Sequence, residues 1–111
     1  MNIKEQDGTI ILELKGKLVG GSLTDRMDRA LDNLIAQGKK NIVFDLGGIT
    51  SLNSSGIGML IGSFSKINSS GGELKFANIS YKLRGLFSDT KLNQVFKVYN
   101  TTEEAIKSFN K

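Results

Sequence analysis

One stretch of the chain combines residue types that could do chemistry: LNSSGIGMLIG, from Leu52 to Gly62. It packs two serines and three glycines against a run of apolar residues. A glycine-rich segment after a strand can cradle a phosphate with its backbone amides, start a helix, or carry a phosphate on one of its own serines. The choice among these three alternatives decides most of what the sequence implies about function.

The glycine spacing argues against a bound nucleotide. A dinucleotide-binding loop needs glycines at its first, third and sixth positions. Gly56 and Gly58 fit the first two positions, but Ile61 occupies the sixth. A Walker loop is excluded because no Gly-Lys-Ser or Gly-Lys-Thr follows. We therefore expect no nucleotide cofactor at this loop, and a nucleotide-binding protein or enzyme is kept only as a third hypothesis.

The apolar spacing favours a helix from about residue 54 to residue 70, with Ser54 as its N-cap. Five apolar side chains are expected to form a stripe against a sheet: Ile57, Leu60, Ile61, Phe64 and Ile67. The opposite face then holds Ser55, Gly58, Met59, Gly62 and Lys66. Glycine inside a helix costs about 1 kcal/mol relative to alanine. Two glycines beside an outward methionine indicate either a weak or closely packed helix, or an adaptable docking surface for another protein.

Ser54 and Ser55 stand at the start of this expected helix. A serine there is ordinarily a cap that accepts a hydrogen bond from an unpaired backbone amide. A phosphate on such a serine would add about −1.5 to −2 charges beside the positive end of the helix dipole. The fold should tolerate that charge, so phosphorylation would act on a docked partner and not on folding.

The composition excludes several classes of site. The 111 residues include no cysteine and no histidine, which removes disulfides, thiolate zinc sites and Ser-His-Asp arrangements. We expect no metal site, no cofactor and no enzyme, because the scattered acids offer no nucleophile–base pair. The net charge of +4 forms no basic block, so we expect no nucleic-acid partner. No apolar segment has the length of a signal peptide or membrane span, and we expect a cytoplasmic protein.

The elements that must position the serines alternate between strands and helices. Strands are expected at residues 1–6 and 9–18, paired as a hairpin, and at 41–46, 73–79 and 94–99. Besides the helix at 54–70, helices are expected within 20–40, capped by Ser22 or Thr24, and at 81–90 and 101–109. This β-β-α-β-α-β-α-β-α order predicts an α/β fold: one domain over residues 1–111, with a mixed sheet of about four to five strands and helices packed on it.

A family resemblance is carried by FDLGGITSLNSSGIGMLIGSFSKINSSGGELKFANIS and by LRGLFSDTKLNQVFKVYNTTEEAI. These segments resemble the anti-sigma factor antagonist family, the STAS domain, over essentially the whole chain. The most specific part is the strand, Asp-Leu, loop and Ser-Ser-Gly-Ile-Gly helix unit. The resemblance implies a STAS-like fold and a binding module that is not an enzyme. In that family the domain binds an anti-sigma factor that is also a serine kinase. Phosphorylation of a serine at the start of the second helix breaks the complex, and a phosphatase restores it.

Carried onto this chain, the resemblance implies that Ser54 is the phosphoacceptor. The residues expected to bind the partner are Val19, Gly20, Asn53, Ser55, Gly56, Gly58, Met59, Gly62 and Lys66. Asn53 and Val19 stand where the family usually or often has aspartate, so the partner surface must differ in charge from that of a typical kinase. Their lack of charge supports a second hypothesis, a non-switching STAS adaptor subunit in a signalling or lipid-transport assembly.

Overall fold

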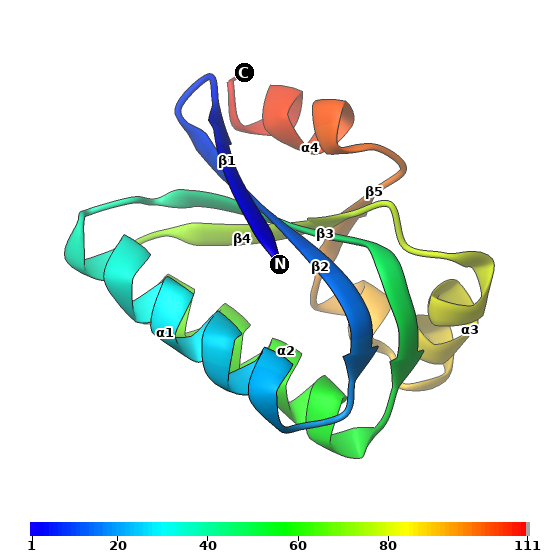
Figure 1. Cartoon of the computed structure of the whole chain (residues 1–111). Helices are drawn as coiled ribbons and strands as arrows, with labels where there is room; N and C mark the ends of the chain where they lie inside the picture. The colour runs from blue at the N-terminus through cyan, green and yellow to red at the C-terminus, as the bar shows by residue number, and fades with distance from the viewer. Residues whose placement is uncertain (111) are drawn as a thin grey trace.

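The computed structural model describes residues 1–110 and confirms the expected order of strands and helices within them (Figure 1). In chain order the elements are β1 (Asn2–Gln6), β2 (Thr9–Leu18), α1 (Ser22–Ala36), β3 (Asn41–Leu52), α2 (Ser54–Ser69), β4 (Glu73–Ala77), α3 (Tyr81–Asp89), a 3-10 turn (Leu92–Gln94), β5 (Lys97–Tyr99) and α4 (Thr102–Phe109). None of the helices in this part of the chain is long and apolar enough to cross a membrane.

The five strands form one mixed sheet in the order β1-β2-β3-β4-β5. β1 pairs antiparallel with β2, and the other neighbours are parallel. The turn between β1 and β2 places Asp7 and Gly8 at φ angles of 54° and 79°, the positive values that a tight hairpin turn requires. α1 and α2 cover one face of the sheet and α4 lies on the other (Figure 1). The expected mixed sheet and its hairpin are therefore confirmed.

The main core lies between the sheet and the layer of α1, α2 and α3. Alternation along β2 sends Ile10, Leu12 and Leu14 into this core and Ile11 to the opposite face. The ring of Phe76 lies at its centre, with three other rings at centroid distances of 4.4 to 6.2 Å: Phe44, Phe87 and Phe96. Phe87 and Phe96 are both buried.

The face under α4 has a smaller core, in which Ile11, Val43 and Ala77 meet Ala105 and Ile106. Beside it lies a buried lysine, Lys75, which is only 3% exposed. Its Nζ donates to Ser108 Oγ at 2.5 Å and lies 4.0 Å from the centroid of the Phe109 ring. The ammonium group of Lys75 therefore joins the sheet to the last turn of α4.

Side-chain caps begin three of the four helices in residues 1–110. The cap oxygen accepts a hydrogen bond from the amide three residues on in each of the pairs Asn53–Gly56, Ser80–Leu83 and Thr101–Glu104. The expected cap Ser54 is wrong, because Asn53 takes that position and Ser54 is the first helical residue. Ser22 and Thr24 are also wrong as caps of α1, which begins after Gly21 without a side-chain cap. Gly20 and Gly21 have φ angles of 95° and 87°, which explains glycine at this turn.

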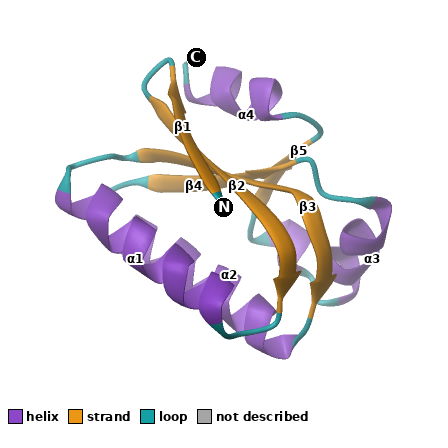
Figure 2. Ribbon diagram, in the orientation of Figure 1, coloured by secondary structure: helices purple, strands orange, loops and turns teal. Residues whose placement is uncertain are grey.

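β3 and β5 differ most from their expected ranges, whereas β4 ends two residues earlier than expected, at Ala77, and β1 begins one residue later, at Asn2. β3 continues beyond residue 46 because β2 stays paired with it as far as Leu18 opposite Leu52. Figure 2 shows β2 and β3 running on together beyond the end of β4. β5 is shorter than expected because residues 92–94 form a 3-10 turn, entered through Lys91 at a φ of 61°.

Candidate functional site

The start of α2 is joined to the loop after β2 by the side chain of Asn53. Its Oδ1 accepts a hydrogen bond from the Gly56 amide at 3.0 Å. Its Nδ2 donates toward the carbonyl oxygen of Val19 at 3.5 Å, a long contact. The carboxamide thus has a donor for the loop and an acceptor for the helix, which a carboxylate could not supply. Asn53 therefore orients Ser54, the exposed residue that follows it.

Gly56 lies against the end of β2. A Cβ built on Gly56 would lie 1.9 Å from the carbonyl oxygen of Leu18, a distance that no side chain tolerates. Gly56 is buried as a result, so the expectation that it contributes to a partner-binding surface is wrong. Its role is to let the first turn of α2 press against β2. Nearby, a Cβ on Gly20 would lie 3.9 Å from Cβ of Ser55, which places the β2–α1 loop beside the serines.

Four of the five residues expected in the buried stripe are in the main core or packed against it: Ile57, Leu60, Phe64 and Ile67. The most buried side of α2 is nevertheless rotated from the expected one. Its buried residues are Gly56, Met59, Leu60, Ser63 and Ile67. The expected outward position of Met59 is wrong, since Met59 is 9% exposed and belongs to the main core. The expected core position of Ile61 is also wrong, since 43% of Ile61 is exposed. The hydrophobic pattern predicted the wrong rotation of α2 because two small residues that are not strongly apolar, Gly56 and Ser63, lie on its most closely packed side.

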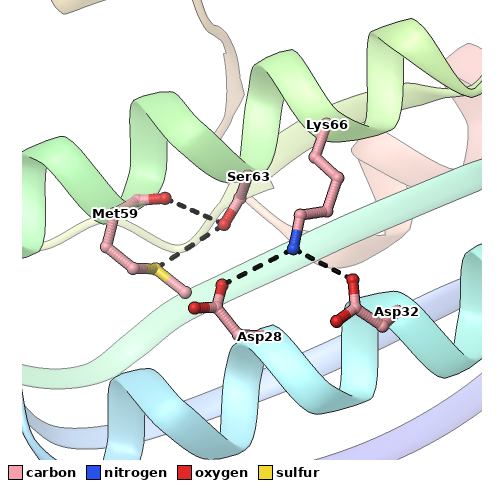
Figure 3. Close-up of polar contacts among 5 residues, drawn as sticks. All are labelled: Asp28, Asp32, Met59, Ser63 and Lys66. Atoms are coloured by element: carbon pink, nitrogen blue, oxygen red, sulfur yellow. Dashed lines mark hydrogen bonds and ion pairs between the residues drawn. The ribbon is translucent and has the colours of Figure 1, made fainter.

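Ser63 is 2% exposed and satisfies its hydroxyl within the helix (Figure 3). Its Oγ donates to the carbonyl oxygen of Met59 at 2.9 Å and lies 3.6 Å from the Met59 sulfur. This back-bonding to the residue four positions earlier is the usual way for a serine to lie inside a helix. Ser63 is therefore a packing residue and adds no hydroxyl to the surface.

Lys66 lies on the side of α2 that faces α1, as Figure 3 shows. Its Nζ lies 3.0 Å from Asp32 Oδ1 and 3.9 Å from Asp28 Oδ1, and its side chain is 37% exposed. The expectation that Lys66 points outward from the docking face is wrong, because the two carboxylates of α1 draw its long side chain across the helix pair. Lys66 joins two helices and leaves the outer face of α2 without a charge from this residue.

The remaining expected site residues and the exposed Ile61 form one surface, which we name the α2 patch: Val19, Gly20, Asn53, Ser54, Ser55, Gly58, Ile61 and Gly62. Ile61 is the member that the sequence pattern missed, because an isoleucine at helical spacing ordinarily predicts core. All eight residues are uncharged, and Val19 and Ile61 expose 37% and 43% of their surface. The patch combines two apolar side chains, two exposed hydroxyls and bare helix backbone, a composition suited to contact with another protein.

The polar chemistry of the α2 patch is limited to hydroxyl, carboxamide and backbone groups. Within residues 1–110 no group of three or more His, Cys, Asp or Glu side chains is placed to hold a metal ion. Ser54 and Ser55 lie in the first turn of α2, where the unpaired amides and the helix dipole favour negative charge. A phosphoryl group on either serine would therefore be stabilised locally.

Sequence comparison matches residues 1–105 to the STAS domain. One relative, named an anti-sigma F factor antagonist from Paenibacillus polymyxa, is 23% identical over 107 residues, which cover 96% of this chain and 91% of the relative.

Three solved structures share the fold. A protein from Thermotoga maritima, provisionally named an anti-sigma factor antagonist, gives a TM-score of 0.89 at 23% identity and covers 99% of this chain and 94% of its own. The phosphorylated form of the Bacillus cell fate determinant SpoIIAA gives 0.74 at 22% identity, with 97% of both chains covered. A sulfate transporter family protein from Wolinella succinogenes gives 0.81 at 19% identity, with 93% and 85% covered. From the match over residues 1–105, this chain belongs to the STAS domain family.

Proposed function

We propose that this protein is an anti-sigma factor antagonist that binds an anti-sigma factor serine kinase through the α2 patch. One observation carries the proposal: Ser54 is exposed at the first position of α2, among the uncharged residues of the α2 patch. The relative from Paenibacillus polymyxa is named for the same activity, which supports this choice within the family. By controlling the kinase, the protein would regulate transcription that depends on a sigma factor in the cytoplasm.

Phosphorylation of Ser54 is the proposed off-switch. The phosphoryl group would add about −1.5 to −2 charges to a patch whose own residues carry none. Dehydrating that dianion at an interface, without a cation on the partner to pair it, costs several kcal/mol by the general rule for buried charges. The helix dipole at the same place stabilises the phosphate in the free protein. Both effects favour the dissociated state, and a phosphoserine phosphatase would reverse it.

Incubation with the candidate kinase and ATP tests the assignment, with the modified residue mapped by mass spectrometry. We expect one phosphate, on Ser54, and no modification of the Ser54→Ala variant. The matched control is Ser55→Ala, which removes the neighbouring exposed hydroxyl and should still be phosphorylated. Modification on Ser55 alone would refute the assignment of the acceptor, and no modification at all would refute the switch.

A second function, that of a non-switching adaptor subunit, is favoured by two observations. The likeness to the sulfate transporter family protein extends over 93% of this chain. Asn53 and Val19 lack the carboxylates expected beside the kinase contact. An adaptor would co-purify with its assembly whether Ser54 is serine or aspartate, whereas the antagonist would lose its partner in the Ser54→Asp variant.

An enzymatic role has no comparable support, and we propose a binding module. Calorimetric titration with ATP and GTP checks this point. Heat from stoichiometric nucleotide binding at micromolar affinity would contradict it.

A further inference from the structure

β3 has a free edge along its second half. β4 pairs with β3 only as far as Ala77 opposite Asp45, whereas β2 stays paired with β3 to Leu52. Residues 46–52 therefore have a strand on one side only, and α3 stands beyond the other side (Figure 1). Within the described part of the chain, no backbone hydrogen bond joins this segment to α3. Apart from the Gly47 amide, which donates to Asp45 Oδ1 at 2.9 Å, an edge of this kind leaves backbone N–H and C=O groups for water or another chain.

A groove of about 360 Å³ lies between this edge and α3. β3 contributes Ile49, Thr50, Ser51 and Leu52, and the other wall is formed by Ser80, Lys82, Leu83, Gly85, Leu86 and Asp89. Gly85 contributes no side chain to the α3 wall, and a Cβ built on it would meet nothing within 4 Å, so space is open at this position. The groove therefore offers a strand edge beside a partly apolar floor, which is the arrangement that binds an extended peptide by strand addition.

Charges of opposite sign lie toward the two ends of the α3 wall. Lys82 and Asp89 are exposed and seven residues apart on the helix. At 1.5 Å per residue this separation is about 10.5 Å, the span of about three to four extended residues. An extended segment with an acidic residue at one end, a basic residue at the other and apolar residues between them matches this pattern.

We propose that the free edge of β3 accepts an extended segment of a partner protein as an added strand. The apolar side chains of the added segment contact Leu52 and Leu83 and fill the open space beside Gly85. The acidic end of the segment faces Lys82. This interaction goes beyond the proposed function and does not depend on phosphorylation of Ser54, because it uses backbone groups of β3 and side chains of α3.

NMR titration of the ¹⁵N-labelled protein tests the proposal with two probes that differ in charge order: acetyl-Glu-Val-Thr-Val-Lys-amide and acetyl-Lys-Val-Thr-Val-Glu-amide. We expect amide shifts at residues 48–52 and in α3, with one charge order binding several-fold more tightly. A third probe is the more tightly binding of these two peptides, N-methylated at one valine and at the neighbouring threonine. Neighbouring amides point to opposite edges of an extended peptide, so whichever edge faces β3 loses a hydrogen-bond donor. It should bind at least tenfold more weakly. Absence of shifts at residues 48–52, or equal binding of the methylated peptide, would overturn the proposal.

Two substitutions at one position separate the groove from the stability of α3. Gly85→Leu fills the groove and should weaken peptide binding at least tenfold, whereas Gly85→Ala adds only a Cβ and should leave binding within twofold. Both replace glycine with a better helix former, so neither should unfold α3. Equal binding by both variants would contradict the proposed position. The Ser54→Asp variant should bind the peptide normally, so failure here and failure of the phosphorylation switch are distinguishable.

Discussion

Gly56 of α2 and the carbonyl oxygen of Leu18 in β2 are in such close contact that a Cβ on Gly56 would lie 1.9 Å from that oxygen. Substitution of Gly56 by alanine must therefore move the helix away from the strand. We expect Gly56→Ala to lower the free energy of unfolding by about 1–3 kcal/mol, the usual cost of overpacking. Urea denaturation monitored by circular dichroism measures the loss.

Gly58, two residues further along the same helix, supplies the matched control. A Cβ built on Gly58 meets nothing within 4 Å. Gly58→Ala should stabilise the protein by about 0.5–1 kcal/mol, because alanine is the better helix former. Equal effects of the two substitutions would contradict the close contact at Gly56.

Asn53 is the side-chain cap of α2. Asn53→Ala removes the acceptor of the Gly56 amide and should cost about 0.5–2 kcal/mol of stability. Asn53→Asp keeps an acceptor beside the positive end of the helix and should stay within about 0.5 kcal/mol of the wild type. Thermal denaturation of the three proteins at neutral pH compares them. If Asn53→Asp were as unstable as Asn53→Ala, the donor to Val19 would be the more important of the two contacts.

Ser54→Asp places a negative charge at the first position of α2, where the helix dipole is favourable. We expect its Tm to equal or slightly exceed that of the wild type, while binding of the anti-sigma factor kinase falls at least tenfold. Ser69→Asp is the control, since it adds the same charge to the last, exposed residue of the same helix. It should lower the Tm slightly and leave binding unchanged. Loss of binding in both variants would point to a general effect of charge and not to Ser54.

Lys75 tests how much a buried ammonium group contributes to the packing of α4. Its contacts with Ser108 and the Phe109 ring offset the cost of removing the charge from water. Lys75→Met keeps the volume, and Ser108 Oγ still donates to the carbonyl oxygen of Ala105. We expect Lys75→Met to remain within about 1 kcal/mol of the wild type. Lys75→Ala should be less stable because it leaves a cavity. Hydrogen exchange of the α4 amides measures how firmly α4 is packed in each variant. If exchange became faster in Lys75→Met but not in Lys75→Ala, the contacts of the ammonium group would contribute more than its burial costs, contrary to our expectation.

The Glu73–Lys97 pair should give stability a pH dependence of known sign. The hydrogen bond from Lys97 lowers the pKa of Glu73 below 4.5, and the same contact raises the pKa of Lys97 above 10.5. The contribution of Glu73 is present above its unfolded pKa and is lost as the pH falls through its folded pKa. The contribution of Lys97 is present below its unfolded pKa and is lost as the pH rises through its folded pKa.

A double-mutant cycle with Glu73→Gln and Lys97→Met isolates this pair. The coupling free energy should be small, because the side chains of Lys97 and Glu73 are 63% and 41% exposed to water, and it should be constant through the neutral range. It should vanish at both the acidic and the alkaline end of the titration. A coupling that persisted in strongly acidic solution would show that the two side chains interact without the charge of Glu73.

The order of the elements could be predicted from the sequence because local patterns determine it. The alternation in β2 and the helical spacing in α1 each specify one buried face, and the Asp7-Gly8 turn fits a hairpin. The length of β3 could not be predicted, because it depends on pairing with β2 over residues distant in sequence. Local propensity contains no information about where a neighbouring strand ends.

The rotation of α2 could not be predicted for a different reason. A hydrophobic stripe predicts burial from residue type alone, so the apolar Ile61 was expected in the core. The actual contact is set by space, because Gly56 allows the backbone of β2 to approach. Met59 then turns inward beside Ser63, and Lys66 reaches the carboxylates of α1. Glycine in the first turn of the helix was the available signal, since a close approach of backbones is a common reason for glycine there.

The absence of charge from the α2 patch has a consequence for the rate and ionic-strength dependence of recognition. A partner that docks on Val19, Ile61 and the serines gains little from long-range attraction to the patch itself, so its association rate should depend weakly on salt. A single phosphate changes that regime. The patch then has a local electric field that salt can screen, so the association rate of the phosphorylated protein should depend more strongly on salt. Ionic strength would thus distinguish the unphosphorylated and the phosphorylated state of the proposed binding surface.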